Sequence, residues 1–282
     1  MLPRRSDSPA PLFGGKLLMT FWKPALGGLV LATTLATGPI SIAGASAQAM
    51  SSQYSVSLIG LPVGRASFDT TIDGSRFSIE GTLASTGLAD IVSKTAGSSR
   101  VAGRIRGDSI FAESYGLSYT SDKRSYSSTV AFRSGRVETA EVAPKVTRRK
   151  ADYVPVKPSE LRAVVDPLSG LMIKAKATPD AVCSRTLPFF DGWSRLDLQL
   201  SPNGTRAFST DGFEGDAIAC NVRVKPVSGY RATSKGVKFI QAQTIELWFA
   251  PIGATGIFAP VYAKIPTEIG PLTLRASSFA KN

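Results

Sequence analysis

The side chains that usually carry acid–base or nucleophilic chemistry are scarce in this chain. Its 282 residues include no histidine and two cysteines. Histidine is the general base of Ser-His-Asp and Cys-His sites and a common ligand of zinc and haem iron. Two cysteines cannot complete a four-cysteine zinc or iron–sulfur site. These classes are therefore excluded, we expect no cofactor or metal, and carboxylate, lysine or serine chemistry remains, or none.

Three aspartates are the candidates for carboxylate chemistry: Asp166, Asp191 and Asp197. Two carboxyl groups about 5–10 Å apart, one with a raised pKa, catalyse glycoside hydrolysis. Each aspartate also has a local structural explanation. Asp166 precedes Pro167 as a helix N-cap would, Asp191-Gly192 is typical of a turn, and Asp197 can pair with an arginine between strand ends. The sequence leaves both interpretations open, so we name no catalytic residue and keep hydrolysis as the alternative function.

The N-terminal segment is typical of an export signal. Two lysines precede the uncharged apolar stretch Ala25–Ala36, and a run of small residues ends in Ala47-Gln48-Ala49. A membrane-spanning helix needs about 20 apolar residues, whereas Gly38-Pro39 interrupts this stretch after about a dozen. We therefore expect a signal peptide over residues 1–49, cleaved near Ala49. The mature chain, residues 50–282, should form one β-rich domain in the periplasm, with no membrane span.

Export changes what the two cysteines predict. In an oxidising compartment the pair Cys183 and Cys220 favours one structural disulfide. Closing that loop removes unfolded-chain entropy worth roughly 4 kcal/mol on the loop-closure model. A redox-active pair would instead prefer close C-x-x-C spacing, which this sequence lacks.

A dense basic run is the candidate contact with an anionic surface. Its basic residues are Lys145, Arg148, Arg149 and Lys150. In an exported protein the natural partner of such a run is phospholipid, lipopolysaccharide phosphate or teichoic acid, and a solvated loop is the alternative. The formal net charge of +12 also fits nucleic acid, but the compartment and the lack of a recognition motif predict no nucleic-acid partner.

The C-terminal part of the chain carries the candidate apolar pocket. Its large side chains are Trp248, Phe249, Phe258 and Tyr262. They can line a pocket at the mouth of a barrel, and ordinary core packing is the alternative.

Alternation of apolar and polar residues after residue 50 predicts strands with one apolar face. Tyr54–Leu58 alternates apolar residues with serine, and Asp73-Gly74 separates two such runs as a hairpin turn would. About twelve runs, including Lys238–Phe249, favour an all-β fold with a few short helices: a strongly curved antiparallel sheet, either an open or an incomplete β-barrel. Pro144–Pro158 interrupts the pattern as a long loop or as a hinge between two halves of the sheet.

Short motifs in the second half of the chain carry a resemblance to a known family. They are DPxSG at Asp166, Pro167 and Gly170, then Cys183, FDGxxR at Phe190, Asp191, Gly192 and Arg195, and then Cys220. With them the chain resembles a family of exported proteobacterial proteins known only as a domain of unknown function. The resemblance implies a periplasmic β-rich protein with a disulfide between the matched cysteines and no established catalytic residue. By fold analogy, such proteins are similar to open-barrel lipoprotein carriers, which hold acyl chains.

We therefore predict a non-enzymatic periplasmic envelope protein that supports envelope integrity. Its partner would be an apolar ligand, such as a lipid or a lipoprotein acyl chain, or another envelope protein. The alternative is a carboxylate-dependent hydrolase that acts on an envelope polymer, and a third possibility is a purely structural partner of an outer-membrane complex. An accessible apolar cavity would favour the first function over the second.

Overall fold

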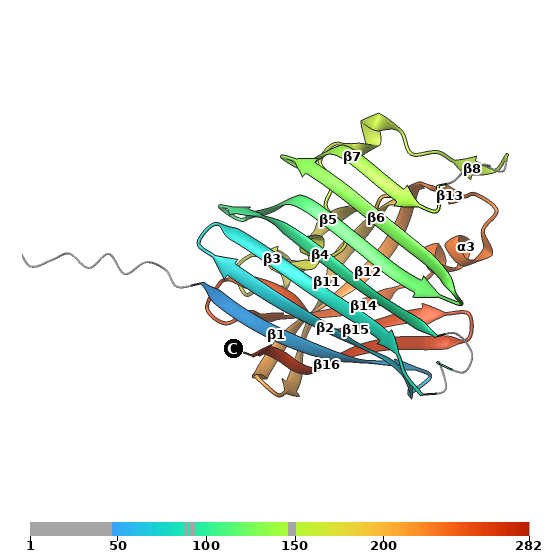
Figure 1. Ribbon diagram of the computed structural model, residues 1–282. Coiled ribbons are helices and arrows are strands. Elements are labelled where there is room, and N and C mark those ends of the chain that lie inside the picture. Colours follow the sequence, from blue (N-terminus) through green and yellow to red (C-terminus); the bar gives the residue numbers. More distant parts are fainter. Residues whose placement is uncertain (1–46, 88–89, 91–93, 146–150, 282) are drawn as a thin grey trace, which may run out of the picture. The chain divides into compact units, whose positions relative to one another are not determined.

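One antiparallel sheet of 14 strands dominates the part of the chain that the computed structural model describes (Figure 1). The described residues are 47–87, 90, 94–145 and 151–281. Successive side chains of a strand point to opposite faces, so the alternation in the sequence gives each strand one apolar face for a shared core. The prediction of an all-β fold is confirmed. No helix among the described residues is long and apolar enough to cross a membrane.

The N-terminal half of the sheet is a meander in which each strand pairs with the next. Its strands are β1 (Gln48–Leu58), β2 (Leu61–Asp73), β3 (Arg76–Ser85), β4 (Thr95–Arg106), β5 (Ser109–Ser121), β6 (Arg124–Arg133) and β7 (Arg136–Ala143). The predicted turn at Asp73-Gly74 is confirmed, because Asp73 pairs with Arg76 and Gly74 has a φ of +55°. Residues 1–46 of the predicted signal peptide lie outside the described residues, and the predicted cleavage site after Ala49 falls within β1.

The C-terminal half contains the two longest strands, β11 and β12, and the labelled helices. Its strands are β10 (Arg185–Phe190), β11 (Arg195–Thr210), β12 (Phe213–Ser228), β14 (Ile245–Pro251), β15 (Ile257–Thr267) and β16 (Gly270–Lys281), and the short strands are β8 (Tyr153–Val154), β9 (Ile173–Lys174) and β13 (Tyr230–Arg231). The labelled helices are η1 (Pro158–Leu161), η2 (Ser169–Leu171), α2 (Pro179–Cys183) and α3 (Lys235–Ala242). β16 pairs with β1, which joins the two halves.

The predicted strand over Lys238–Phe249 is wrong in its first part. Residues Lys235–Ala242 form α3, and the strand begins only at Ile245. Ser234 caps the helix by accepting a hydrogen bond from the Val237 N–H at 3.4 Å. Helical spacing places Ile240 against the neighbouring apolar cluster. The cap and this contact outweigh a local pattern that also fits a strand.

The strand order within the sheet is β10-β11-β12-β14-β15-β16-β1-β2-β3-β4-β5-β6-β7, with β9 paired to β15. The two edge strands, β7 and β10, do not pair with each other, so the sheet remains open. We call the opening between these two edge strands the seam. A connecting segment, residues 152–172, spans it. The Val164 N–H donates to the Gly135 carbonyl in the β6–β7 turn at 2.8 Å, and the Val165 carbonyl accepts from the Phe190 N–H of β10 at 2.9 Å.

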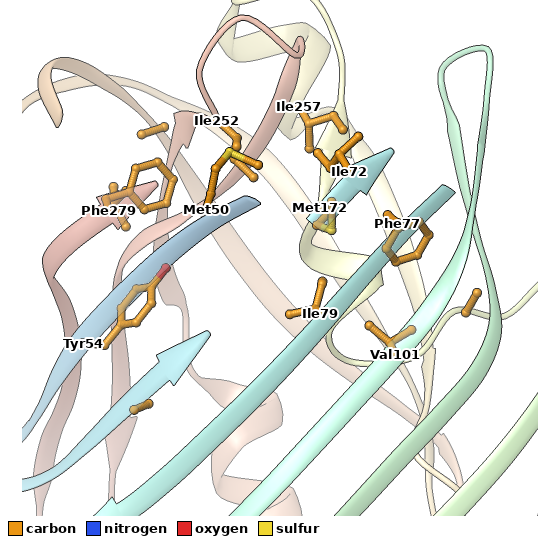
Figure 2. Packing of buried hydrophobic residues seen from close by; sticks show 14 of the residues in the cluster. Met50, Tyr54, Ile72, Phe77, Ile79, Val101, Met172, Ile252, Ile257 and Phe279 are labelled. Atoms are coloured by element: carbon orange, nitrogen blue, oxygen red, sulfur yellow. The ribbon is translucent and has the colours of Figure 1, made fainter. Parts of the chain in front are cut away.

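Two clusters of buried apolar side chains form the core. In Figure 2, Met50, Tyr54 and Ile79 of the N-terminal strands lie in one cluster with Met172 and Ile252. The second cluster surrounds the two cysteines and draws on β10–β12, β14 and β15. Both clusters contribute side chains to the wall of an apolar cavity.

Candidate functional site

An apolar cavity of about 300 Å³ lies between the two core clusters. Strands from both halves of the sheet supply its walls, and the residues that follow Asp166 complete them. Representative lining residues are Met50, Phe68, Ile79, Leu171, Leu247 and Phe279. This volume is at the lower end of the range for small-molecule sites, about 300–1,000 Å³.

The polar groups at the cavity wall are few, and two of them are hydrogen-bonded within the protein. The Tyr54 hydroxyl donates to the Pro260 carbonyl at 2.7 Å, and burial raises the pKa of this phenol far above its ordinary value. Ser52 Oγ accepts a hydrogen bond from the Ala280 N–H at 3.0 Å. Because these groups are already engaged, the wall offers an occupant mainly apolar contact.

The DPxSG motif shapes one wall of the cavity. Asp166 is fully buried, and its Oδ1 accepts hydrogen bonds from the N–H groups of Leu168 at 2.8 Å and Ser169 at 2.9 Å. Its Oδ2 accepts from the Ser169 hydroxyl. Burial raises the pKa of Asp166, and these hydrogen bonds oppose that rise. The carboxylate thus folds the chain into the turn that presents Leu168 and Leu171 to the cavity.

Gly170 completes the motif because a side chain does not fit at this position. A Cβ there would lie 2.4 Å from Cε1 of Phe189 and 2.6 Å from Cγ2 of Val165. Contacts this short do not occur between carbon atoms in folded proteins. The glycine therefore lets η2 approach β10 at the seam.

The FDGxxR motif lies at the same seam and begins at Phe190, the last residue of β10. Asp191 Oδ1 accepts hydrogen bonds from the N–H groups of Trp193 at 2.8 Å and Ser194 at 2.7 Å, which is an Asx turn. The Ser128 hydroxyl of β6 donates to the Asp191 carbonyl at 2.6 Å. Gly192 has a φ of +99°, and a Cβ there would lie 2.1 Å from Ser128 Oγ. The motif therefore brings the β10–β11 turn against β6.

Arg195 ends the motif and ties it to the connecting segment. Its side chain is nearly buried, donates to the Glu160 carbonyl at 3.2 Å and pairs with Asp197 at 2.6 Å. The Ser228 hydroxyl donates to the Glu160 carboxylate at 2.7 Å, and this bond, with the Lys157 N–H, lowers the pKa of Glu160. These polar groups are engaged with one another at the seam.

The three candidate aspartates each have separate partners. Asp166 holds the η2 turn, Asp191 holds the β10–β11 turn, and Asp197 pairs with Arg195. None of these contacts joins one of the three carboxylates to another. The turn at Asp191-Gly192 and the pairing of Asp197 with an arginine are found as expected. The N-cap of η2 is Leu168, so Asp166 holds a turn and does not cap the helix that was expected after it.

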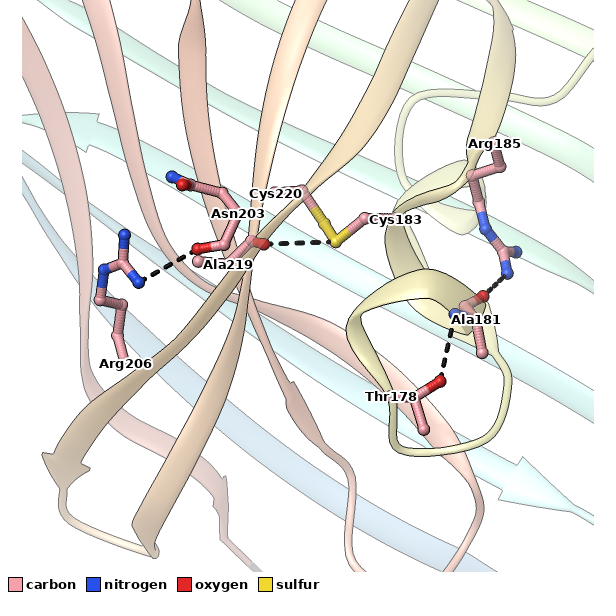
Figure 3. Close-up of a disulfide and its surroundings, with 8 residues drawn as sticks. All are labelled: Thr178, Ala181, Cys183, Arg185, Asn203, Arg206, Ala219 and Cys220. Atoms are coloured by element: carbon pink, nitrogen blue, oxygen red, sulfur yellow. Dashed lines mark hydrogen bonds between the residues drawn. A yellow bond between two sulfur atoms is a disulfide. The ribbon is translucent and has the colours of Figure 1, made fainter.

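Cys183 and Cys220 form a disulfide, as Figure 3 shows. It links the end of α2 to β12, and both cysteines are fully buried within the second core cluster. Thr178 caps α2 by accepting from the Ala181 N–H at 3.2 Å, and Arg185 donates to the Ala181 carbonyl. A helix as short as α2 is not stable on its own. The disulfide holds it against β11–β12, the longest hairpin of the sheet.

Of the four aromatic residues considered for an apolar pocket, Tyr262 lines the cavity. Phe249 and Phe258 are buried in the second core cluster, and Trp248 lies against Tyr262 with ring centroids 4.4 Å apart and the ring planes tilted by 36°. Phe249, Phe258 and Trp248 are accounted for by core packing, the alternative that the sequence left open. The basic run is described only at Lys145, which is exposed; Arg148, Arg149 and Lys150 lie outside the described residues.

Most residues of the cavity wall are not recognisable as lining residues from the sequence. Inward positions on β1–β3 are recognisable from their period of two, as at Met50 and Tyr54. The volume left unfilled between them depends on how distant strands pack, and that is not encoded in any local pattern. The position of the DPxSG motif at the seam between β7 and β10 also depends on the tertiary fold.

Residues 53–277 match the model of a protein family described as "Protein of unknown function (DUF3108)". No curated protein is similar enough to match the chain. Among solved structures, the chain is similar to the crystal structure of a beta-barrel-like protein of domain of unknown function DUF1849 from Brucella abortus. The sequence identity is 7%, the TM-score is 0.49, and the match covers 83% of this chain and 98% of that chain. The predicted resemblance to a family of unknown function is confirmed by the family match.

Proposed function

Since the chain belongs to the family described as protein of unknown function (DUF3108), we propose from its own geometry that it binds an apolar ligand in the cavity. The ligand class is an acyl chain of a lipid or lipoprotein, or an apolar group of similar size. The protein acts as an exported, non-enzymatic component of the cell envelope. The observation that carries the proposal is a cavity of about 300 Å³ with a largely apolar wall.

The hydrophobic effect supplies the binding free energy in this proposal. Each methylene transferred from water to an apolar site contributes about 0.8 kcal/mol. A segment of eight methylenes would therefore gain about 6 kcal/mol before the cost of immobilising the chain. The few polar groups at the wall would place the ligand's head group outside the cavity.

The carboxylates support a binding protein over a hydrolase. Hydrolysis needs two carboxyl groups that face one reacting bond. Here Asp166 and Asp191 each hold a backbone turn, and Asp197 pairs with Arg195. An Asp191→Ala protein that lost hydrolysis of an envelope polymer, with a carboxylate pKa in the pH–rate profile, would favour the hydrolase instead.

Export is part of the proposal. It is supported by the apolar N-terminal stretch followed by Ala47-Gln48-Ala49 and by the buried disulfide, which persists in oxidising compartments. Cell fractionation with thiol labelling tests it. We expect the disulfide-bonded protein, shortened at its N-terminus, outside the cytoplasm; a full-length cytoplasmic protein with two free thiols would contradict export.

Ligand binding is tested by titrating the purified protein with a fluorescent polyene fatty acid and by mass spectrometry of lipids that co-purify. Ala259 lines the cavity and is half-buried. An Ala259→Phe side chain would fill part of the volume, so we expect at least tenfold weaker binding. Ala131 of β6 has similar exposure and does not line the cavity, which makes Ala131→Phe the matched control. Equal binding by the two variants, or no binding by the unmodified protein, would refute the proposal.

A further inference from the structure

Large apolar side chains are exposed at one end of the sheet. Ile59, Leu61 and Ile269 are 60%, 59% and 67% exposed. Ile59 lies in the β1–β2 turn, Leu61 is the first residue of β2 after it, and Ile269 lies in the β15–β16 turn. The two turns are neighbours: Leu58 pairs with both Leu61 and Leu272, and the Ile59 N–H donates to the Pro271 carbonyl at 3.0 Å. We call these two turns the apolar tips.

The backbone of the β1–β2 turn makes the choice of isoleucine unusual. Ile59 and Gly60 have φ values of +51° and +80°, so both central residues of this two-residue turn are left-handed. Such turns favour Asn-Gly, and a β-branched residue in this region is strained. At the opposite end of the sheet, the β6–β7 turn has φ values of +51° and +75° and contains Ser134-Gly135. The backbone thus accepts a polar residue, and neither conformation nor burial explains Ile59.

Exposed lysines lie at the same end as the apolar tips. Figure 1 shows α3 at the end of the sheet where β1 ends, and α3 contacts β15. Lys235 and Lys238 of α3 and Lys264 of β15 are exposed, and Glu268 lies in the β15–β16 turn. Lys264 precedes the end of β15 by three residues, about 10 Å at the rise of a strand. Apolar side chains that enter a membrane by about 5–10 Å would thus place this ammonium group among lipid phosphates.

The cavity reaches toward this end of the sheet. Ile265 lines the cavity, remains half-buried and pairs with Leu272, just before the β15–β16 turn. Leu274, on the neighbouring strand, lines the cavity as well. Ile265 precedes the exposed Ile269 by four residues along the chain.

We propose that the apolar tips dock the protein on an anionic phospholipid membrane, with Ile59, Leu61 and Ile269 inserted among the lipids and the nearby lysines facing phosphate groups. Contiguous exposed apolar groups commonly mark sites of interaction, and the flanking lysines favour a negatively charged lipid surface. Docking does not depend on occupation of the cavity. It goes beyond the proposed function by assigning a separate surface.

The test compares binding of the purified protein to vesicles of phosphatidylglycerol and phosphatidylethanolamine with binding to phosphatidylcholine vesicles. We expect co-sedimentation with the anionic vesicles, weakened by salt. The triple variant Ile59→Asn, Leu61→Thr, Ile269→Thr should bind at least tenfold more weakly. Ser134→Asn, in the matching turn at the other end, should bind as the unmodified protein does. An Ile269→Trp variant should show a blue-shifted emission on the anionic vesicles.

Two outcomes would overturn membrane docking. One is a triple variant that is folded by circular dichroism and binds vesicles as the unmodified protein does. The other is an unmodified protein that binds no vesicles, which would leave the tips to an apolar protein partner. Fatty-acid titration of the same triple variant should be unchanged, so a failure of docking is distinguishable from a failure of cavity binding.

Discussion

The two halves of the sheet are held together by different means. In the N-terminal half, β1–β7 follow one another through hairpins, and each strand is held by its sequence neighbours. In the C-terminal half, α3 and β13 intervene between β12 and β14, a disulfide joins α2 to β12, and a buried aspartate shapes the turn at η2. The motif residues gather in this half and at the seam.

The difference indicates which parts of the fold require particular residues at particular positions. A hairpin meander needs alternation and suitable turn residues, and many sequences satisfy both. The seam instead brings together segments distant in sequence, such as Ser128 with Asp191 and Glu160 with Ser228. Closing such contacts costs chain entropy, and buried polar groups there need matched partners. Four changes test this contrast.

The largest effect is expected from the disulfide. Replacing Cys183 and Cys220 together by serine should lower the free energy of unfolding by roughly 4 kcal/mol, because the unfolded chain regains the entropy of the closed loop. Urea unfolding under oxidising conditions measures it. A reductant should destabilise the unmodified protein by a similar amount and leave the double variant unchanged. A loss below about 1 kcal/mol would show that the C-terminal half does not depend on this link.

The next effect compares one glycine from each half. Gly170→Val should lower the free energy of unfolding by about 1–3 kcal/mol, because its Cβ would meet Phe189 and Val165. Gly116→Val on β5 is the matched control. There the nearest atom to a Cβ is Cγ of Arg100 at 3.6 Å, so we expect a change within about 0.5 kcal/mol. Equal losses in thermal unfolding would contradict the close packing assigned to Gly170.

A smaller effect, of opposite sign, is expected at the β1–β2 turn. Ile59→Asn should raise the free energy of unfolding by about 1 kcal/mol, because asparagine tolerates the left-handed region that strains isoleucine. Ser134→Ile should lower it by a similar amount in the β6–β7 turn. Denaturant titration of both variants measures the two changes in the free energy of unfolding. Destabilisation by Ile59→Asn would mean that Ile59 has a structural role, not the docking role proposed for it.

The smallest effect is a pH dependence at the connecting segment. Thr233 and Arg231 lower the pKa of Asp152 to about 2 through hydrogen bonds to its carboxylate. An acid whose pKa is lowered by folding stabilises the folded state above its ordinary pKa, and this contribution is lost as the pH falls toward 2. The midpoint temperature of thermal unfolding should therefore fall more steeply below pH 4 for the unmodified protein than for Asp152→Asn. Parallel plots of midpoint temperature against pH for the two proteins would show that Asp152 does not stabilise the contact between β8 and β13.

Several features of the site were predicted from local sequence. The turn role of Asp191-Gly192 and the pairing of Asp197 with an arginine are visible in adjacent residues. The predicted strand at Lys238–Phe249 was wrong at its start, because the cap at Ser234 and the packing of Ile240 favour a helix. An N-cap at Asp166 was expected from Asp-Pro; here its carboxylate holds a turn instead.

Alternation, turn residues and the cysteine pair already specified an all-β chain with one disulfide, because strand faces and turn conformations depend on neighbouring residues. The cavity, the seam and the adjacency of Ile59 to Ile269 arise only when β16 pairs with β1 and the connecting segment bridges the edges. These features depend on contacts between residues distant in the sequence, from 63 positions between Ser128 and Asp191 at the seam to 228 between Ser52 and Ala280. The volume left between packed side chains is a property of the whole sheet.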